Sequence, residues 1–427
     1  MVIFAEIFPL NFNSVIMDFN RIPIRIIVIL AAVVLFVTSC TKDDNESSNT
    51  YLVSNELVFT YSKLTINSMI DLAAIQNPQI ATLKQYIASD VKIYRITYKS
   101  STGGKEYNAS GLVCVPVNQG DYPVLSFQNG TNTLNLQAPS VNPSNSNYVL
   151  VEILASMGFV VVIPDYPGFG ESVSIPHPYL VKEPTVTSIV DMFYATEELD
   201  ATALPDISAL NEYYLVGYSQ GGWATMALHK ALELDFSSDF NLVGSVCGAG
   251  PYDIGLLFSG MVNVTTYPMP VYLGYIFNAY SAYGQITNPV SEIFKEPYAS
   301  RISTLYNGTK SSDQINAQLT TSIPDLLNAS FITGYNTDTR FSSVRKAFSD
   351  NSIEAWHTYK PLLMVHGGSD TQVNPVTTET MYNGMLQAGT SSDICRKVII
   401  PGADHSDGVL PAMIEGINFL LTIKDNR

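Results

Sequence analysis

Residues 213–228, YYLVGYSQGGWATMAL, decide the fold. An apolar run typical of a buried strand leads into Gly-x-Ser-x-Gly, and helix-forming residues follow directly. A strand-to-helix turn this tight needs small residues beside the serine, and the glycines at 217, 221 and 222 supply them. The sequence therefore predicts that Ser219 stands exposed on a strained turn, as a candidate nucleophile.

A serine hydroxyl needs a general base, and the base needs a carboxylate that fixes its tautomer. His405 lies in the loop between an apolar strand ending at Ile400 and the last helix. Asp370 follows another strand, which ends at His366. Loops at the carboxyl ends of parallel strands are where sites form in such sheets. The order Ser219, Asp370, His405 predicts a catalytic triad.

Two other carboxylates compete with Asp370 for the role of the acid. Asp404 and Asp407 flank His405 in the sequence. A residue so close along the chain reaches the far ring nitrogen of the histidine poorly. Of the other histidines, we expect His366 to be structural although it lies near the site. His177 lies on a loop that can reach the cleft, where a structural turn is the favoured interpretation over substrate contact. We expect no catalytic role for the remaining two histidines, His229 and His357.

An acyl-transfer site also needs donors for the oxyanion of the tetrahedral intermediate. The backbone N–H that follows the nucleophile is that of Gln220. The loop after the third predicted strand, Asn129-Gly130-Thr131, offers a second donor, the N–H of Thr131. A tight turn without catalytic duty is the alternative for this loop.

Alternating strand and helix patterns predict an α/β fold, with a mostly parallel central sheet flanked by helices. Residues 51 to about 90 show helical periodicity. Gly103-Gly104 separates two strand patterns, which predicts a hairpin. Six further strand patterns follow, at 122–127, 159–165, 213–216, 242–247, 361–366 and 397–400, and helix patterns alternate with them after the first.

The alternation stops between residues 251 and 350, where aromatic residues are frequent. We predict a largely helical cap, inserted over the carboxyl edge of a core formed by residues 51–250 and 351–427. The aromatic side chains of the cap favour an acyl or aryl group in the pocket, so we expect them to determine the acyl specificity. A structural subdomain that contacts no site is the alternative.

The N-terminus has the pattern of an export signal. Arg21 and Arg25 precede an apolar run at residues 26–37, which is short for a membrane span. Val37-Thr38-Ser39-Cys40 is similar to the lipobox of bacterial lipoproteins, in which the cysteine is acylated and becomes the mature N-terminus. We therefore predict a lipoprotein signal peptide over residues 1–39, with Met17 as an alternative start. An ordinary cysteine beside a plain signal peptide is the alternative for Cys40.

Residues 40–50 are polar and acidic, which predicts a flexible tether. The lysine and acidic residues after Cys40 also resemble the export signal of surface lipoproteins in some diderm bacteria. These features predict an exported lipoprotein, held at the outer membrane on its periplasmic or cell-surface face through a lipid on Cys40.

Composition restricts the other partners. A formal net charge of −16 argues against nucleic acid, and 46% hydrophobic residues allow a large core. Cys114, Cys247 and Cys395 lie in apolar segments, so we expect small buried side chains, although one disulfide is open. No cysteine and histidine cluster has metal-ligand spacing, and the sequence predicts neither a metal nor a cofactor.

Together these segments resemble the α/β-hydrolase superfamily, and more narrowly its secretory-lipase-like serine esterases. The resemblance covers roughly residues 90–427 and departs at Asn129-Gly130, where many relatives have His-Gly. Its motifs are residues 217–222 (GYSQGG), 164–170 (PDYPGFG), 366–370 (HGGSD) and 402–405 (GADH).

The resemblance implies a carboxylesterase or lipase that cleaves a small-molecule, glycan or lipid ester through an acyl-enzyme. A serine peptidase is the first alternative, because amide hydrolysis uses the same machinery. An inactive surface binding lipoprotein is the second alternative.

Overall fold

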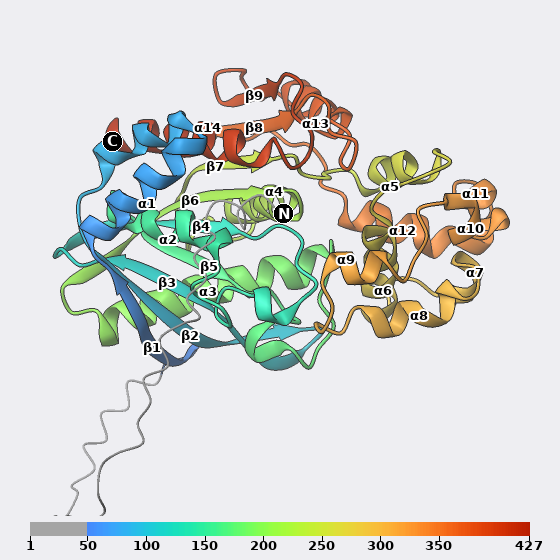
Figure 1. The fold of residues 1–427 in the computed structure, drawn as a ribbon, viewed down its shortest axis with the longest axis horizontal. Coiled ribbons are helices and arrows are strands. Elements are labelled where there is room, and N and C mark those ends of the chain that lie inside the picture. The colour runs from blue at the N-terminus through green and yellow to red at the C-terminus, as the bar shows by residue number, and fades with distance from the viewer. Residues whose placement is uncertain (1–48) are drawn as a thin grey trace, which may run out of the picture.

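The computed structural model describes residues 49–427, and a nine-stranded sheet runs through this part of the chain (Figure 1). The strand order is β1-β2-β3-β5-β4-β6-β7-β8-β9. Strands β4 to β9 pair parallel with one another, whereas β1, β2 and β3 pair antiparallel at one edge, and β3 is also antiparallel to β5. The strands are β1 (Leu52–Tyr61), β2 (Val91–Thr102), β3 (Lys105–Pro116), β4 (Gly120–Gln128), β5 (Val160–Pro164), β6 (Ile207–Tyr218), β7 (Leu242–Gly248), β8 (Leu362–Gly367) and β9 (Cys395–Ile400).

Helices cover both faces of the sheet, as the alternating strand and helix patterns predict. On β5, Val160 and Val162 face one layer, while Val161 and Ile163 face the other. The first layer holds α3 (Lys182–Ala203), α4 (Gln220–Leu234) and α13 (Val376–Gln387). The second holds α1 (Lys63–Gln76), η1 (Pro78–Tyr86), α2 (Ser146–Glu152), η3 (Ile153–Met157) and α14 (Val409–Asp425). Three further single turns are η2 (Asn135–Gln137), η4 (Gly170–Ser172) and η5 (Thr339–Phe341).

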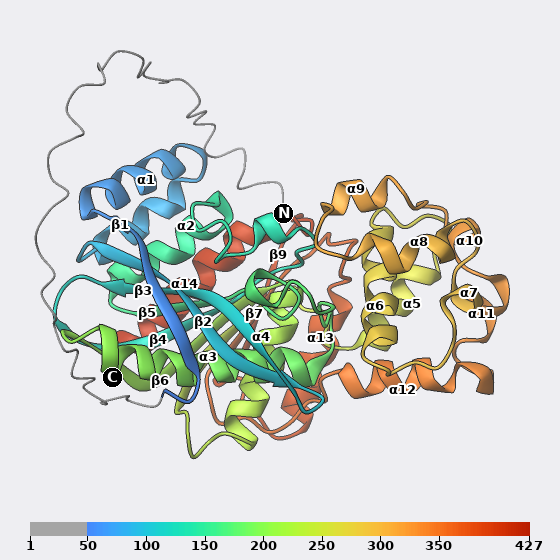
Figure 2. The same cartoon turned by 90° about the horizontal axis from the view of Figure 1, so that it is seen from below.

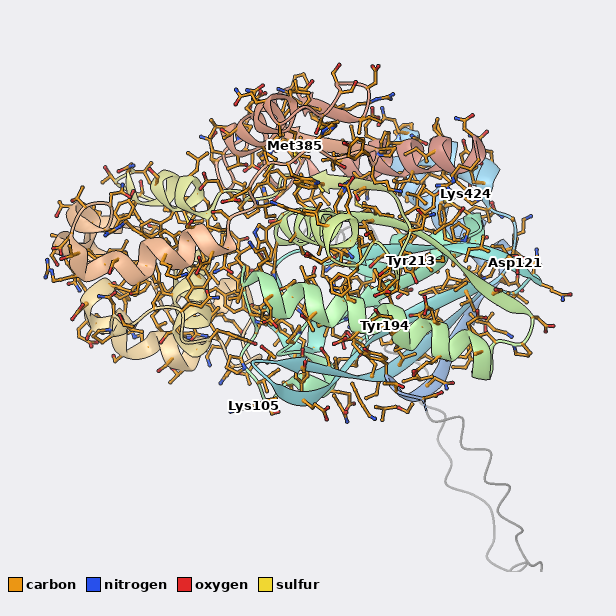
Figure 3. All side chains as sticks on the ribbon, turned by 180° about the vertical axis from the view of Figure 1, so that it is seen from behind. Lys105, Asp121, Tyr194, Tyr213, Met385 and Lys424 are labelled. Carbon is orange, nitrogen blue, oxygen red and sulfur yellow. The ribbon has the colours of Figure 1, made fainter. Side chains whose placement is uncertain are left out.

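The layer between β6 and α3 shows how the core is built. Tyr213 of β6 packs against Phe193 of α3, with ring centroids 4.7 Å apart, and its hydroxyl donates to Glu197. Tyr194 lies one position further along α3, and Figure 3 labels it together with Tyr213. The buried hydroxyl is therefore satisfied within an otherwise apolar layer.

The N-terminal segment differs from the prediction in one element. Residues 52–61 form β1 rather than a helix, while α1 and η1 follow as helices. Most of β1 is exposed, so little apolar burial marks it in the sequence. Pairing with β2 decides its conformation, because an edge strand gains its hydrogen bonds from a neighbour that is distant in sequence. The Glu198 carboxylate also accepts the N–H groups of Thr50, Tyr51 and Leu52, which fixes the start of this strand.

The remaining strands follow the prediction. β2 and β3 form the expected hairpin, and both glycines of its turn have positive φ, +55° at Gly103 and +76° at Gly104. Cys114, Cys247 and Cys395 are buried and free, so the disulfide left open by the sequence is not formed. In residues 49–427 no helix is both long and apolar enough to cross a membrane. The predicted signal peptide, Cys40 and all but the last two residues of the tether lie outside the described residues.

A helical cap is inserted between β7 and β8, and it forms a lobe at one end of the molecule (Figure 2). Its helices are α5 (Ile254–Val262), α6 (Pro270–Ala282), α7 (Val290–Ile293), α8 (Tyr298–Leu305), α9 (Ser312–Asn316), α10 (Ile323–Leu326), α11 (Ala329–Gly334) and α12 (Ser342–Asn351).

Many aromatic rings of the cap pack against one another. Phe258 contacts Phe277, Phe331, Tyr335 and Phe348, with ring centroids 4.9–5.7 Å apart. We call these five residues the aromatic cluster. All are buried, and they are continuous with the hydrophobic layer that holds α3 and α4.

Candidate active site

The turn around Ser219 has the strained geometry that its glycines predict. β6 ends at Tyr218, α4 begins at Gln220, and Ser219 between them has φ +59° and ψ −122°. A Cβ atom on Gly221 would overlap the carbonyl of Gln128, so the neighbouring strand excludes any side chain there. This close packing holds the serine at the carboxyl edge of the sheet.

The structure brings Ser219, His405 and Asp370 together in one chain of hydrogen bonds. His405 Nε2 lies 2.9 Å from Ser219 Oγ, and His405 Nδ1 lies 2.6 Å from Asp370 Oδ2. A carboxylate only accepts, so Nδ1 carries the proton and Nε2 is left to accept from the serine. Both His405 and Asp370 are buried. This arrangement lets the imidazole take the serine proton as the hydroxyl attacks.

Asp370 is held as a carboxylate by several donors. The backbone N–H groups of Gln372 and Val373 donate to Oδ1, both at 2.9 Å. Burial raises the pKa of Asp370, but hydrogen bonds from His366 and His405 outweigh burial and hold that pKa well below its usual range. The acid therefore stays ionised at neutral pH and can stabilise an imidazolium.

His366 has a contact that the sequence did not reveal. Its Nε2 lies 2.9 Å from the Val373 carbonyl and 3.2 Å from Asp370 Oδ2, so Nε2 carries the proton. Its Nδ1 accepts from Thr378 Oγ1 at 2.7 Å. His366 was expected to be structural, and here it orients the carboxylate that orients His405. The sequence signal that could have indicated this contact is the histidine directly before the Gly-Gly-Ser-Asp run.

The rival carboxylates form other contacts. Asp404 is exposed, and its Oδ1 accepts the N–H groups of Ser406 and Asp407, so it closes its own turn. Asp407 is also exposed, and neither carboxylate bonds to His405 in the described chain. His229 is buried between Ser245 and Thr358, and His357 stacks on Tyr359, away from the triad.

The two predicted oxyanion donors lie beside the serine. Gln220 begins α4, where the first N–H groups have no partner within the helix. Thr131 follows β4 and lines the same cavity as Ser219 and His405. Within residues 49–427 the N–H groups of Thr131 and Gln220 form no hydrogen bond. Both groups are therefore free to donate to a developing oxyanion.

Asn129, at the position where the resemblance has a histidine, holds the loop that carries Thr131. Its Nδ2 donates to the carbonyl of Pro164 at the end of β5, and its carbonyl accepts from the Tyr166 hydroxyl at 3.3 Å. Thr131 Oγ1 lies 3.1 Å from the hydroxyl of Tyr179. The loop is therefore fixed to the segment after β5, so the backbone donor does not depend on a histidine.

His177 is a neighbour of Gln220 that the sequence did not identify. His177 Nδ1 lies 2.8 Å from the Pro167 carbonyl, which only accepts, so this nitrogen carries the proton. His177 Nε2 therefore accepts from Gln220 Nε2 at 2.9 Å. Burial lowers the pKa of His177 to about 4, so the ring is neutral near pH 7. Pro-His-Pro predicts a turn, and no local pattern indicates its partner.

A cavity of about 370 Å³ contains Ser219 and His405, and its walls differ at the two ends. The cap contributes Met269, Tyr272 and the three residues at the start of α9. No member of the aromatic cluster lines the cavity, whereas Tyr272 of the cap does, so the expectation that cap aromatics determine the acyl specificity stays a prediction that only Tyr272 could meet among these six rings. The rings of the aromatic cluster pack against one another within the cap. The apolar walls come instead from α1, η1, α2, η3 and α14, through Ile70, Ile80, Leu83, Leu150, Val151, Ile153, Met157, Val409, Leu410, Met413, Ile414 and Ile417.

Fold and site together define a class. A mostly parallel sheet carries a serine on a strand-to-helix turn, with a histidine and an aspartate after later strands, which is the arrangement of α/β hydrolases. The chain belongs to the alpha/beta hydrolase family, whose model matches residues 144–413. No group of three or more potential metal ligands occurs in the described part of the chain.

Solved structures with the same fold cover most of the chain. A protein of Legionella pneumophila, described as a hydrolase, is 26% identical, with a TM-score of 0.77 over 88% of this chain and 98% of that one. The rice cell wall degrading esterase LipA of Xanthomonas oryzae is 23% identical, with a TM-score of 0.74 over 88% and 98%. Candida antarctica lipase A in its closed state is 14% identical, with a TM-score of 0.65 over 88% and 82%. No curated protein sequence gives a significant match.

Proposed function

We propose that the protein is a serine hydrolase that cleaves carboxylic esters through an acyl-enzyme. The observation that carries this proposal is the hydrogen-bonded chain from Ser219 Oγ through His405 to Asp370. Ser219 is the nucleophile, His405 the general base and Asp370 the group that holds the imidazole in the required tautomer.

The reaction follows from the positions of these groups. As Ser219 Oγ attacks the ester carbonyl, His405 Nε2 takes its proton and the carbonyl oxygen becomes an oxyanion. The N–H groups of Thr131 and Gln220 stabilise that charge. The intermediate collapses as His405 protonates the leaving alcohol. Water then attacks the acyl-enzyme by the same route and releases the acid.

Esters are favoured over peptides by the walls of the cavity. The walls that η1, η3 and α14 form are aliphatic or thioether groups, which suit an alkyl chain better than the hydrogen-bonding backbone of a peptide. Two proteins with the same fold are an esterase and a lipase, at identities that indicate only the fold. Faster cleavage of peptide amides than of any ester would assign the protein to the peptidases instead.

The test uses protein that lacks residues 1–40, with p-nitrophenyl esters as substrates and a fluorophosphonate as the label. Wild type is expected to hydrolyse the esters and to be labelled. Ser219→Ala is expected to lower kcat at least about 10³-fold and to abolish labelling, because the nucleophile is lost. Ser406→Ala removes another serine hydroxyl of the cavity and should keep both. Wild type with no turnover and no label would refute the proposal.

We propose separately that the protein is an exported lipoprotein of the outer membrane, acylated at Cys40. The support is the sequence alone, in which a basic and apolar segment precedes Val37-Thr38-Ser39-Cys40. Labelled palmitate should be incorporated into the full chain and not into Cys40→Ser. Equal labelling of both proteins would refute the proposal.

A further inference from the structure

We infer that the cavity holds the acyl chain of a medium-chain ester in an aliphatic channel, which runs between the N-terminal helices and α14. This inference rests on the proposed function and adds the class of acid that the enzyme releases. The channel is the part of the cavity lined by α1, η1, α2, η3 and α14. It lies on the side of the sheet opposite to α3 and α4.

α14 fixes the direction of the channel. The helix begins at Val409, four residues after His405, and its residues from Val409 to Ile417 repeatedly line the cavity. At 1.5 Å per residue, this stretch extends about 12 Å along the helix. The channel therefore starts beside the catalytic histidine and continues away from it along α14.

The facing walls come from two other segments. Leu150, Val151, Ile153 and Met157 lie on α2 and η3, while Ile70 of α1 and residues of η1 complete this part of the lining. These side chains are aliphatic or thioether groups, which offer no hydrogen bond to a sugar or a charged group, so burial of such a ligand there would leave its polar atoms unpaired. The two polar residues of α2 that line the cavity are Asn147 and Tyr148, and the Tyr148 hydroxyl already donates to the Gln137 carbonyl. An unbranched alkyl chain fits this surface.

The cap side of the cavity carries three adjacent polar residues and a charge, while Gln137, Asn147 and Gln372 line it elsewhere. Ser311, Ser312 and Asp313 lie at the start of α9, and Asp313 is the only carboxylate among the lining residues of the described chain. The two sides of an ester therefore face different surroundings. The aliphatic channel takes the acyl side, which leaves the alcohol toward the cap.

The dimensions indicate the chain length. A hydrocarbon chain with C–C bonds of about 1.5 Å advances roughly 1.3 Å per carbon, so about 12 Å accommodates roughly eight to ten carbons. Burial of each methylene should raise kcat/KM about fourfold until the channel is full. We therefore expect kcat/KM to rise from acetate to about octanoate or decanoate and then to level or fall.

The experiment measures the ratio of kcat/KM for p-nitrophenyl octanoate to that for the acetate, because a ratio does not depend on the fraction of active protein. Ile414→Phe places a ring in the channel and should lower the ratio at least tenfold. Leu420→Phe adds a ring to the same helix at a buried position outside the cavity, and should leave the ratio unchanged. Ile417→Ala lengthens the channel, so its dodecanoate to octanoate ratio should rise above that of wild type.

Four results would overturn the inference. If wild type is labelled by the fluorophosphonate but prefers acetate, the serine hydrolase stands and the acyl channel is wrong. If Ile414→Phe folds and keeps the wild-type ratio, the channel does not hold the acyl group. If Ile414→Phe does not fold, an unchanged dodecanoate to octanoate ratio in Ile417→Ala overturns it instead. Absence of both turnover and label refutes the proposed function and the channel together.

Discussion

The cap and the layer around α14 use apolar residues in opposite ways. In the cap, rings such as Phe258 and Phe277 pack edge to face and bury their surface against one another. Around α14, aliphatic side chains such as Ile414 line an open space. An aromatic-rich insertion above a site therefore does not itself identify the substrate pocket. Rings that stabilise a lobe of short helices are unavailable to a ligand.

The largest effect should follow from breaking the aromatic cluster. Phe277→Ala removes a fully buried ring and should cost about 3–5 kcal/mol of unfolding free energy, because a cavity remains. Denaturant titration measures the loss, and the octanoate to acetate ratio should stay at the wild-type value. A changed ratio in protein of normal stability would mean that the aromatic cluster reaches the substrate. The cap and the layer around α14 would then not differ in this respect.

A smaller effect is expected behind the channel wall, at Glu152 of α2. This side chain is fully buried, and burial raises its pKa to about 8, although the nearby Tyr61 hydroxyl offsets part of the rise. The folded state therefore binds a proton that the unfolded chain, with its ordinary pKa of 4.5, releases at lower pH. The stability that this proton provides is complete below about pH 4.5 and is lost as pH rises to about 8.

Glu152→Gln should remove this dependence. The variant should gain stability relative to wild type as pH rises, by about 3 kcal/mol between pH 5 and pH 8. Thermal or denaturant unfolding at several pH values measures the difference. Phe277→Ala is the matched comparison, because its loss should vary little over this range. A constant difference between Glu152→Gln and wild type would refute the raised pKa.

The smallest effect concerns His177, which contacts both the cap and Gln220. Its ring lies 5.4 Å from that of Tyr275 in α6 and accepts a hydrogen bond from Gln220. His177→Phe should lower kcat about tenfold with little change in KM, since the backbone N–H of Gln220 is proposed to stabilise the transition state. His177→Gln keeps a hydrogen-bonding side chain and should restore part of kcat. Equal loss in both variants, or a change confined to KM, would mean that His177 only supports the fold.

The sequence predicts the site better than its surroundings. Ser219, Asp370 and His405 could be found because each follows a strand in a parallel sheet, so their meeting at one edge follows from topology. β1 could not be found, because its conformation depends on pairing with β2. The channel depends on α1, α2 and α14, which are far apart in sequence. The partner of His177 likewise depends on how two distant loops pack.

The hydrogen bonds that Glu198 accepts at the start of β1, which we call the clamp, have a mechanical consequence. Glu198 holds the first amides of this strand, and β1 then pairs with β2 for most of its length. At about 3.3 Å per residue, the ten residues of β1 separate that clamp from α1 by roughly 33 Å. A force applied to the preceding chain would therefore be borne by the edge of the sheet, well before it reached α1, the helix that contributes Ile70 to the cavity wall.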